Sequence, residues 1–139
     1  MTVVKSRRGE SELEVITKSR ELAKYTIQIC DNEKNFPKRH RWFTNNRIAD
    51  VALDVCGFIY EANSTYVKFW SDYVIRRNNQ IQALNSIERL LLNMTIAYEL
   101  YHVESKRIDY WTGLVIEVQK LLRAWRDSDL KRYSNLMPQ

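Results

Sequence analysis

Apolar residues recur at spacings of three and four along four long stretches of the chain, which short polar segments separate. This period places apolar side chains on one face of an α-helix. The pattern predicts four helices, over residues 12–31, 37–62, 71–102 and 105–127. Four such helices predict one all-α domain over residues 11–127, an antiparallel up-down-up-down four-helix bundle.

Each predicted helix carries an apolar stripe close to heptad spacing, which we expect to form the core. The stripes are Val15, Leu22 and Ile29; Ile48, Val55 and Ala62; Leu84, Ile87, Leu91, Met94, Tyr98 and Tyr101; and Trp111, Leu114, Val118, Leu121 and Trp125. A second apolar set on the third helix comprises Leu90, Leu92, Ile96, Ala97 and Leu100. A helix that is apolar over more than one stripe has more surface to bury than one core provides. We therefore expect this second set to form the interface of a homo-oligomer.

Glycine and proline are scarce, with three and two residues in 139. Sheet proteins need a turn every 8–12 residues or so, and nucleotide-binding α/β domains need a glycine-rich turn, so the composition excludes both classes.

Ser11 and Glu14 form a capping-box pattern that predicts the start of the first helix, and Pro37 suits the first turn of the second. Residues 1–10 are expected to be a flexible basic arm, and residues 128–139 a polar basic tail that frays.

Neither catalysis nor membrane insertion has a visible pattern in the sequence. The longest apolar runs span three or four residues and no charged-then-apolar leader opens the chain, which predicts a cytoplasmic protein. His40 and His102 stand apart, and Glu99 with His102 makes one Glu-x-x-His pair where a bundle metal site uses two. Cys30 and Cys56 fall on apolar stripes, where cysteine packs as a small hydrophobe. We expect no enzyme activity, no cofactor and no metal.

Basic residues outnumber acidic ones by 22 to 17, and the resulting net charge of +5 favours an anionic partner such as nucleic acid. Residues 34–47 hold five cations and no acid. In an antiparallel bundle the second and fourth helices start at the same end, so we expect this cluster to merge with the one at residues 106–107. The predicted nucleic-acid-binding residues are Lys38, Arg39, Arg41, Arg47, Arg76, Arg77, Lys106, Arg107, Lys120, Arg123 and Arg126.

Simpler interpretations of these residues stay open at this point. Charge runs also arise as solvated helix faces. The aromatic residues Tyr66, Phe69, Trp70 and Tyr73 offer a platform on which bases stack, as in single-strand binders. Capping of the core at one bundle end is favoured for them, because large aromatic side chains dominate protein cores.

Several short motifs resemble a known family of four-helix bundles. Asn35-Phe36-Pro37-Lys38 opens a helix that continues to Ile59-Tyr60-Glu61-Ala62-Asn63. This pair resembles the bacterial ribosomal-RNA intervening-sequence proteins, although the glycine that follows in that branch is missing here. The stretches from Ser105 to Trp111 and from Glu117 to Trp125 are more similar to the related accessory variability determinants of diversity-generating retroelements.

The resemblance implies a non-enzymatic accessory protein of a retroelement. Members of that branch form ring-like homopentamers, bind nucleic acid and associate with a reverse transcriptase during mutagenic copying of a template RNA into cDNA, and the resemblance implies the same for this chain. The alternatives are a protein-binding adaptor, whose cations complement an acidic partner, and an rRNA intervening-sequence-type bundle without a retroelement role. An enzyme, for example a bundle metalloprotein, is the least favoured hypothesis.

Overall fold

The computed structural model describes residues 3–138, apart from the side chains of residues 3–11, 13 and 41. Within this range the chain forms four long helices and no strand: α1 (Val3–Asp31), α2 (Asn46–Ser64), α3 (Trp70–Tyr101) and α4 (Ser105–Tyr133). The prediction of an all-α four-helix bundle is confirmed for this part of the chain. None of the described helices has an apolar stretch of the length that a bilayer span needs.

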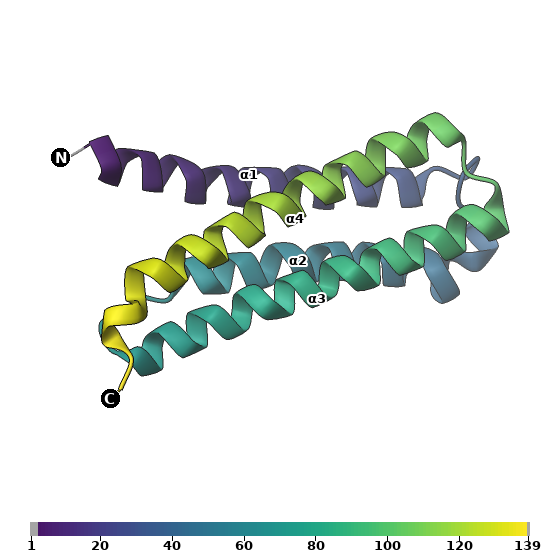
Figure 1. The fold of residues 1–139 in the computed structure, drawn as a ribbon. Coiled ribbons are helices and arrows are strands. Elements are labelled where there is room, and N and C mark those ends of the chain that lie inside the picture. Colours follow the sequence, from purple (N-terminus) through teal and green to yellow (C-terminus); the bar gives the residue numbers. More distant parts are fainter. Residues whose placement is uncertain (1–2, 139) are drawn as a thin grey trace.

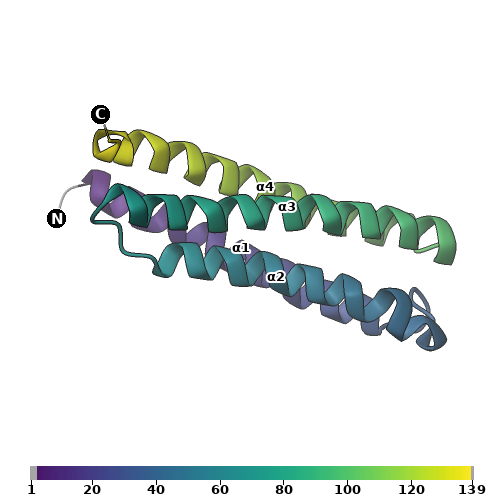
Figure 2. The same cartoon turned by 90° about the horizontal axis from the view of Figure 1, so that it is seen from below.

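The four helices lie lengthwise beside one another, and α2 and α4 each pack against both α1 and α3 (Figure 1, Figure 2). Both described chain ends lie at the same end of the bundle as the connection from α2 to α3 (Figure 1). We call this end the terminal end. The other two connections, residues 32–45 and 102–104, lie together at the opposite end, which we call the loop end.

The core stripes of α1 and α2 are buried as predicted. Each member of these stripes is at most 2% exposed: Val15, Leu22, Ile29, Ile48, Val55 and Ala62. In α4 the heptad row of Trp111, Val118 and Trp125 is also buried. The Trp111 indole N–H donates to the Thr26 hydroxyl at 2.9 Å and so ties α4 to α1 inside the core.

Helix α3 buries Ile87 and Met94 as predicted, but the second row of its buried stripe is not the predicted row of Leu84, Leu91 and Tyr98. Its buried residues at heptad spacing are Tyr73, Arg76, Gln80, Ala83, Ile87, Leu90, Met94 and Ala97. Leu90 and Ala97, which we predicted at an oligomer interface, are therefore core residues without exposed surface. The row of Leu90 was missed because its neighbours at heptad spacing are the small Ala83 and Ala97, whereas the predicted row carries the larger Leu84, Leu91 and Tyr98. Leu92, Ile96 and Leu100 remain exposed.

Helix α4 also continues its core further than the sequence suggested. Its second buried row is Val115 and Leu122, and the predicted Leu114 and Leu121 are only half-buried. Asp129 occupies the next core position and has no exposed surface. Because the helix runs to Tyr133 and a 3₁₀ turn follows over Ser134–Leu136, the predicted fraying tail is wrong for residues 128–136.

Two predicted helix starts are also corrected. Helix α1 begins at Val3, so the backbone of residues 3–10 is helical where an irregular arm was expected, and Ser11 lies inside the helix instead of capping it. After Pro37 the chain forms a 3₁₀ turn, η1 (Lys38–His40), and a π-helical turn, η2 (Arg41–Asn45), before the regular helix α2 begins. The basic segment of residues 38–47 therefore sits mainly on irregular turns at the loop end.

Candidate nucleic-acid interface

The turns η1 and η2 are anchored to the loop end of the core by a few buried groups. The Phe36 ring is buried and packs edge-on against Tyr101 and Trp111, with ring centroids 5.8 and 6.0 Å apart. The Thr44 hydroxyl lies 2.8 Å from the Tyr101 hydroxyl, and the buried Asn45 amide donates to the Cys30 carbonyl at 3.4 Å. These contacts hold the irregular turns in one conformation and fix which side chains point outward.

The outward side chains of these turns and of the start of α2 include both basic and aromatic residues. Lys38, Arg39 and Arg47 are exposed, and among the described residues they form no ion pair. Trp42 and Phe43 lie between them in the chain and are 80% and 74% exposed. We call Lys38–Arg47 the basic–aromatic segment. Arg41, another predicted contact, lies in η2, and its side chain is outside the described part of the structure.

Two open hollows flank Phe43. The first, of about 480 Å³, lies between the start of α2 and α3 and is lined by Phe43, Thr44, Arg47, Ile48, Asp50, Val51, Arg89, Asn93 and Ile96. The second, of about 490 Å³, is lined by Pro37, Arg39, His40, Phe43, Thr44, Leu100 and Tyr101. Both volumes fall in the range of roughly 300–1,000 Å³ that small-molecule sites occupy. The His40 ring stacks on Tyr101 with centroids 5.2 Å apart and forms part of the second wall.

The cluster at residues 106–107 lies at the same end of the bundle, as expected, but it adds little net charge. Lys106 and Arg107 are exposed at the start of α4. Arg107 pairs with Glu104 at 3.5 Å, and exposed Asp109 follows in the same turn. The uncompensated positive charge of the loop end therefore comes from the basic–aromatic segment.

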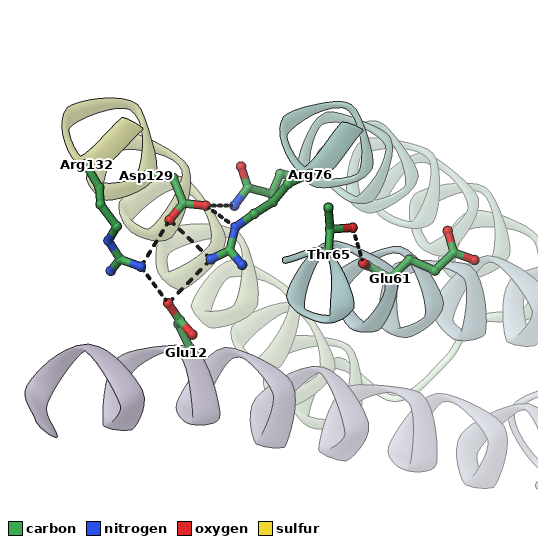
Figure 3. A network of polar contacts seen from close by, with 7 residues as sticks. Glu12, Glu61, Thr65, Arg76, Asp129 and Arg132 are labelled. Carbon is green, nitrogen blue, oxygen red and sulfur yellow. Dashed lines mark hydrogen bonds and ion pairs between the residues drawn. The ribbon is translucent and has the colours of Figure 1, made fainter. Parts of the chain in front are cut away.

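Arg76 is not available to a nucleic acid, which corrects its prediction as a binding residue. Its side chain comes from α3 and is only 5% exposed. Asp129 from α4 accepts its Nε–H at 2.6 Å, and Glu12 from α1 accepts its Nη2–H at 3.4 Å (Figure 3). Arg132 shares Glu12 at 3.3 Å. This arginine fills a core position and links three helices at the terminal end.

The remaining predicted cations are scattered over the surface. Arg77 and Arg126 line a small hollow between α3 and α4 at the terminal end, where Arg126 pairs with Asp127 at 3.3 Å. Lys120 and Arg123 are exposed on α4. Unlike the basic–aromatic segment, these cations are not interleaved with exposed aromatic side chains.

The predicted aromatic junction divides between core and surface. Tyr73 is buried and caps the core as favoured, with Trp70 tilted against it at 5.0 Å. Tyr66 and Phe69 are exposed instead. The exposed aromatic pair beside the free cations, Trp42 and Phe43, was missed by sequence reasoning, although both lie inside the acid-free basic stretch.

The exposed part of the predicted oligomer interface lies close to the basic–aromatic segment. Leu92, Ile96 and Leu100 follow at intervals of four on α3, and we call them the α3 stripe. Ile96 lines the first hollow and Leu100 the second.

Among the described residues, no three His, Cys, Asp or Glu side chains gather as a metal site would require. Burial raises the pKa of the Cys30 thiol to about 12.

Comparisons of this chain with protein-family models, with curated proteins and with solved structures find no match. The resemblance to the retroelement accessory proteins therefore rests on the sequence motifs alone.

Proposed function

We propose that this chain is a non-enzymatic helical scaffold that binds single-stranded nucleic acid through the basic–aromatic segment at its loop end. The observation that carries the proposal is that the exposed rings of Trp42 and Phe43 lie in the chain between Lys38, Arg39 and Arg47, exposed cations without an ion pair among the described residues. Single-strand binders combine these two elements, because the cations contact the phosphates while the rings stack on the bases.

The chemistry of the segment favours a single strand over an acidic protein surface. Base stacking on an aromatic ring contributes about 1–3 kcal/mol per base, and every base has a face that can stack. Cations on the phosphate backbone release counter-ions and add affinity that depends on salt. An acidic protein would use the cations of this segment but would leave the two exposed rings without a specific role.

The biological setting follows from the sequence resemblance. We propose that the chain is an accessory protein of a diversity-generating retroelement, which binds the template RNA or its cDNA and associates with the reverse transcriptase. In this proposal the antiparallel bundles assemble into a homopentameric ring, with the α3 stripe as the part of the predicted interface that remains exposed. The test of that setting is whether a reverse transcriptase is encoded beside this chain and forms a complex with it.

Fluorescence anisotropy with labelled single-stranded RNA and DNA tests the binding proposal. A single-strand complex loses affinity with a slope of about −0.7 per neutralised phosphate against log salt, so three cations predict a slope near −2. Arg39→Glu with Arg47→Glu is expected to abolish binding at low salt. Arg20→Glu with Lys24→Glu makes the same charge change on exposed residues of α1 and is the matched control. Absence of binding by the wild-type chain, or equal losses in both double variants, overturns the proposal.

The α3 stripe favours a second candidate, a protein-binding adaptor, because exposed apolar side chains at helical spacing fit a protein partner. Light scattering distinguishes self-association through the α3 stripe from binding of a different protein. A mass near that of one 16.7 kDa chain removes self-association as the role of the stripe. The adaptor replaces the binding proposal if two results are obtained together. The wild-type chain does not bind nucleic acid, and the variant with Arg39→Glu and Arg47→Glu still captures the reverse transcriptase.

A further inference from the structure

The first hollow beside Phe43 contains polar side chains that the fold does not use. Arg47, Asp50, Arg89 and Asn93 line it, and none of them makes a hydrogen bond or ion pair with another described residue. The buried side chains of Ile48 and Val51 close off the core side of this hollow, and the exposed Phe43 ring forms a wall. We call this site the Asp50 hollow.

A carboxylate is unexpected in a site that otherwise suits phosphate. Asp50 repels phosphate groups, so its presence beside Arg47 and Arg89 points to a ligand that also offers hydrogen-bond donors. An ionised carboxylate only accepts hydrogen bonds, and its two oxygens accept two adjacent N–H groups best. Asn93 adds one amide that can both donate and accept.

Of the common bases, guanine has the Watson–Crick edge that matches these groups. Its N1–H and N2–H groups are adjacent donors, and its O6 beside them is an acceptor. Adenine and cytosine each have a single donor group on this edge, and uracil or thymine has a single N–H between two acceptors, so none of them gives a carboxylate two adjacent N–H groups. Flat aromatic side chains complete such sites by stacking on unpaired bases, and the Phe43 ring lines this hollow.

We propose that the Asp50 hollow binds one unpaired guanine of a single-stranded nucleic acid. The Asp50 carboxylate accepts from guanine N1–H and N2–H, Asn93 donates to O6, and Phe43 stacks on the base. Arg47 and Arg89 contact the flanking phosphates. This inference rests on the proposed function and adds base selectivity to it, whereas contacts to phosphate alone carry no sequence information.

Binding of full-length protein to short single-stranded oligonucleotides tests the inference. The probes are thymine 12-mers, and uracil 12-mers for RNA, that carry one central guanine, adenine or cytosine. One bidentate contact to a base edge corresponds to a preference of about 5- to 150-fold. We expect the wild-type chain to prefer guanine by at least about fivefold, and Asp50→Asn to remove the preference while binding to the unsubstituted oligonucleotide persists. Annealing the probe to its complement is expected to remove the preference as well, since pairing occupies the guanine edge.

Asp54→Asn is the matched control, because Asp54 is an exposed acid one turn further along α2 and does not line the hollow. It is expected to keep the preference for guanine. Binding of all probes with equal affinity overturns the guanine site and leaves the proposed function intact, whereas absence of any binding overturns both. Equal loss of the guanine preference in Asp50→Asn and Asp54→Asn assigns the preference to general charge and overturns the inference. An Asp50→Asn variant that keeps the preference but changes the mass in solution assigns the hollow to a protein contact and overturns it as well.

Discussion

Replacing Asp129 by alanine tests whether a buried ion pair holds the terminal end together. The Asp129 carboxylate has no exposed surface and accepts hydrogen bonds from Arg76 Nε at 2.6 Å and Gln80 Nε2 at 2.8 Å. Removal of one partner of a buried ion pair costs about 3–5 kcal/mol. Glu12 stays within 3.4 Å of the Arg76 guanidinium and retains part of the attraction. We therefore expect a loss of about 3 kcal/mol in the free energy of unfolding, the lower limit of this range.

Urea unfolding followed by helical circular dichroism measures this loss. With an m-value of about 2 kcal/mol/M, the midpoint of Asp129→Ala should fall by about 1.5 M. Asp127→Ala is the control on the same helix, because Asp127 is exposed and pairs with Arg126 at 3.3 Å on the surface. Surface pairs of this kind contribute up to about 1 kcal/mol, so its midpoint should fall by at most about 0.5 M.

A triple variant separates the loss of the pair from a general weakening of α4. Asp129→Leu with Arg76→Met and Gln80→Leu replaces the pair and the buried amide that donates to it by apolar side chains, and such exchanges are often neutral or stabilising. We expect its free energy of unfolding to return to within about 1 kcal/mol of the wild-type value. If Asp129→Ala instead matches Asp127→Ala, the end of α4 does not pack into the core and the fraying tail predicted from the sequence is restored.

Three further experiments probe other parts of the bundle. Leu90→Asp should unfold the chain, because it places a charge in the core. Leu92→Asp changes an exposed residue and should leave the melting temperature unchanged. If the α3 stripe joins subunits, Leu92→Asp should also lower the mass measured by light scattering. The Cys30 thiol, with a pKa of about 12, should resist iodoacetamide at pH 8 in the folded chain and react in urea, as read by peptide mass spectrometry. Hydrogen bonds from the Phe69 and Lys68 amides lower the pKa of Asp72 below its ordinary 3.8. The stability that Asp72 contributes is therefore complete above that value and lost as the pH falls through the lowered pKa, so the melting temperatures of Asp72→Ala and the wild type should converge in acid.

The heptad pattern was sufficient to locate the helices and half of the core. In α1 and α2 the buried row is the apolar row, so Leu22 and Val55 were assigned from spacing alone. In α3 two neighbouring rows are apolar, and the apolar pattern favoured the one with the larger side chains. Tertiary packing buries the row that includes Leu90 and Ala97, and it tolerates the continuation of that row into Arg76 because Asp129 on α4 neutralises the arginine.

Long-range polar contacts explain what the sequence pattern missed. Asp129 is one acid in a polar tail when viewed along the chain, and only its contact with a residue 53 positions away shows that it belongs to the core. The same contact removes Arg76 from the candidate binding residues. Trp42 and Phe43 were passed over for a related reason, since only the irregular course of η1 and η2 after Pro37 shows that both rings are exposed.

Ion pairs and exposed rings together distinguish the basic residues that support the fold from those available to a partner. At the terminal end, Arg76 and Arg132 share buried or half-buried carboxylates between helices, and removing those contacts should weaken the bundle. At the loop end, Lys38 and Arg39 have no such carboxylate among the described residues, and Trp42 beside them contributes little to folding because the hydrophobic effect requires burial. Loss of these side chains should therefore leave stability unchanged, and any effect on nucleic-acid binding would be a direct one.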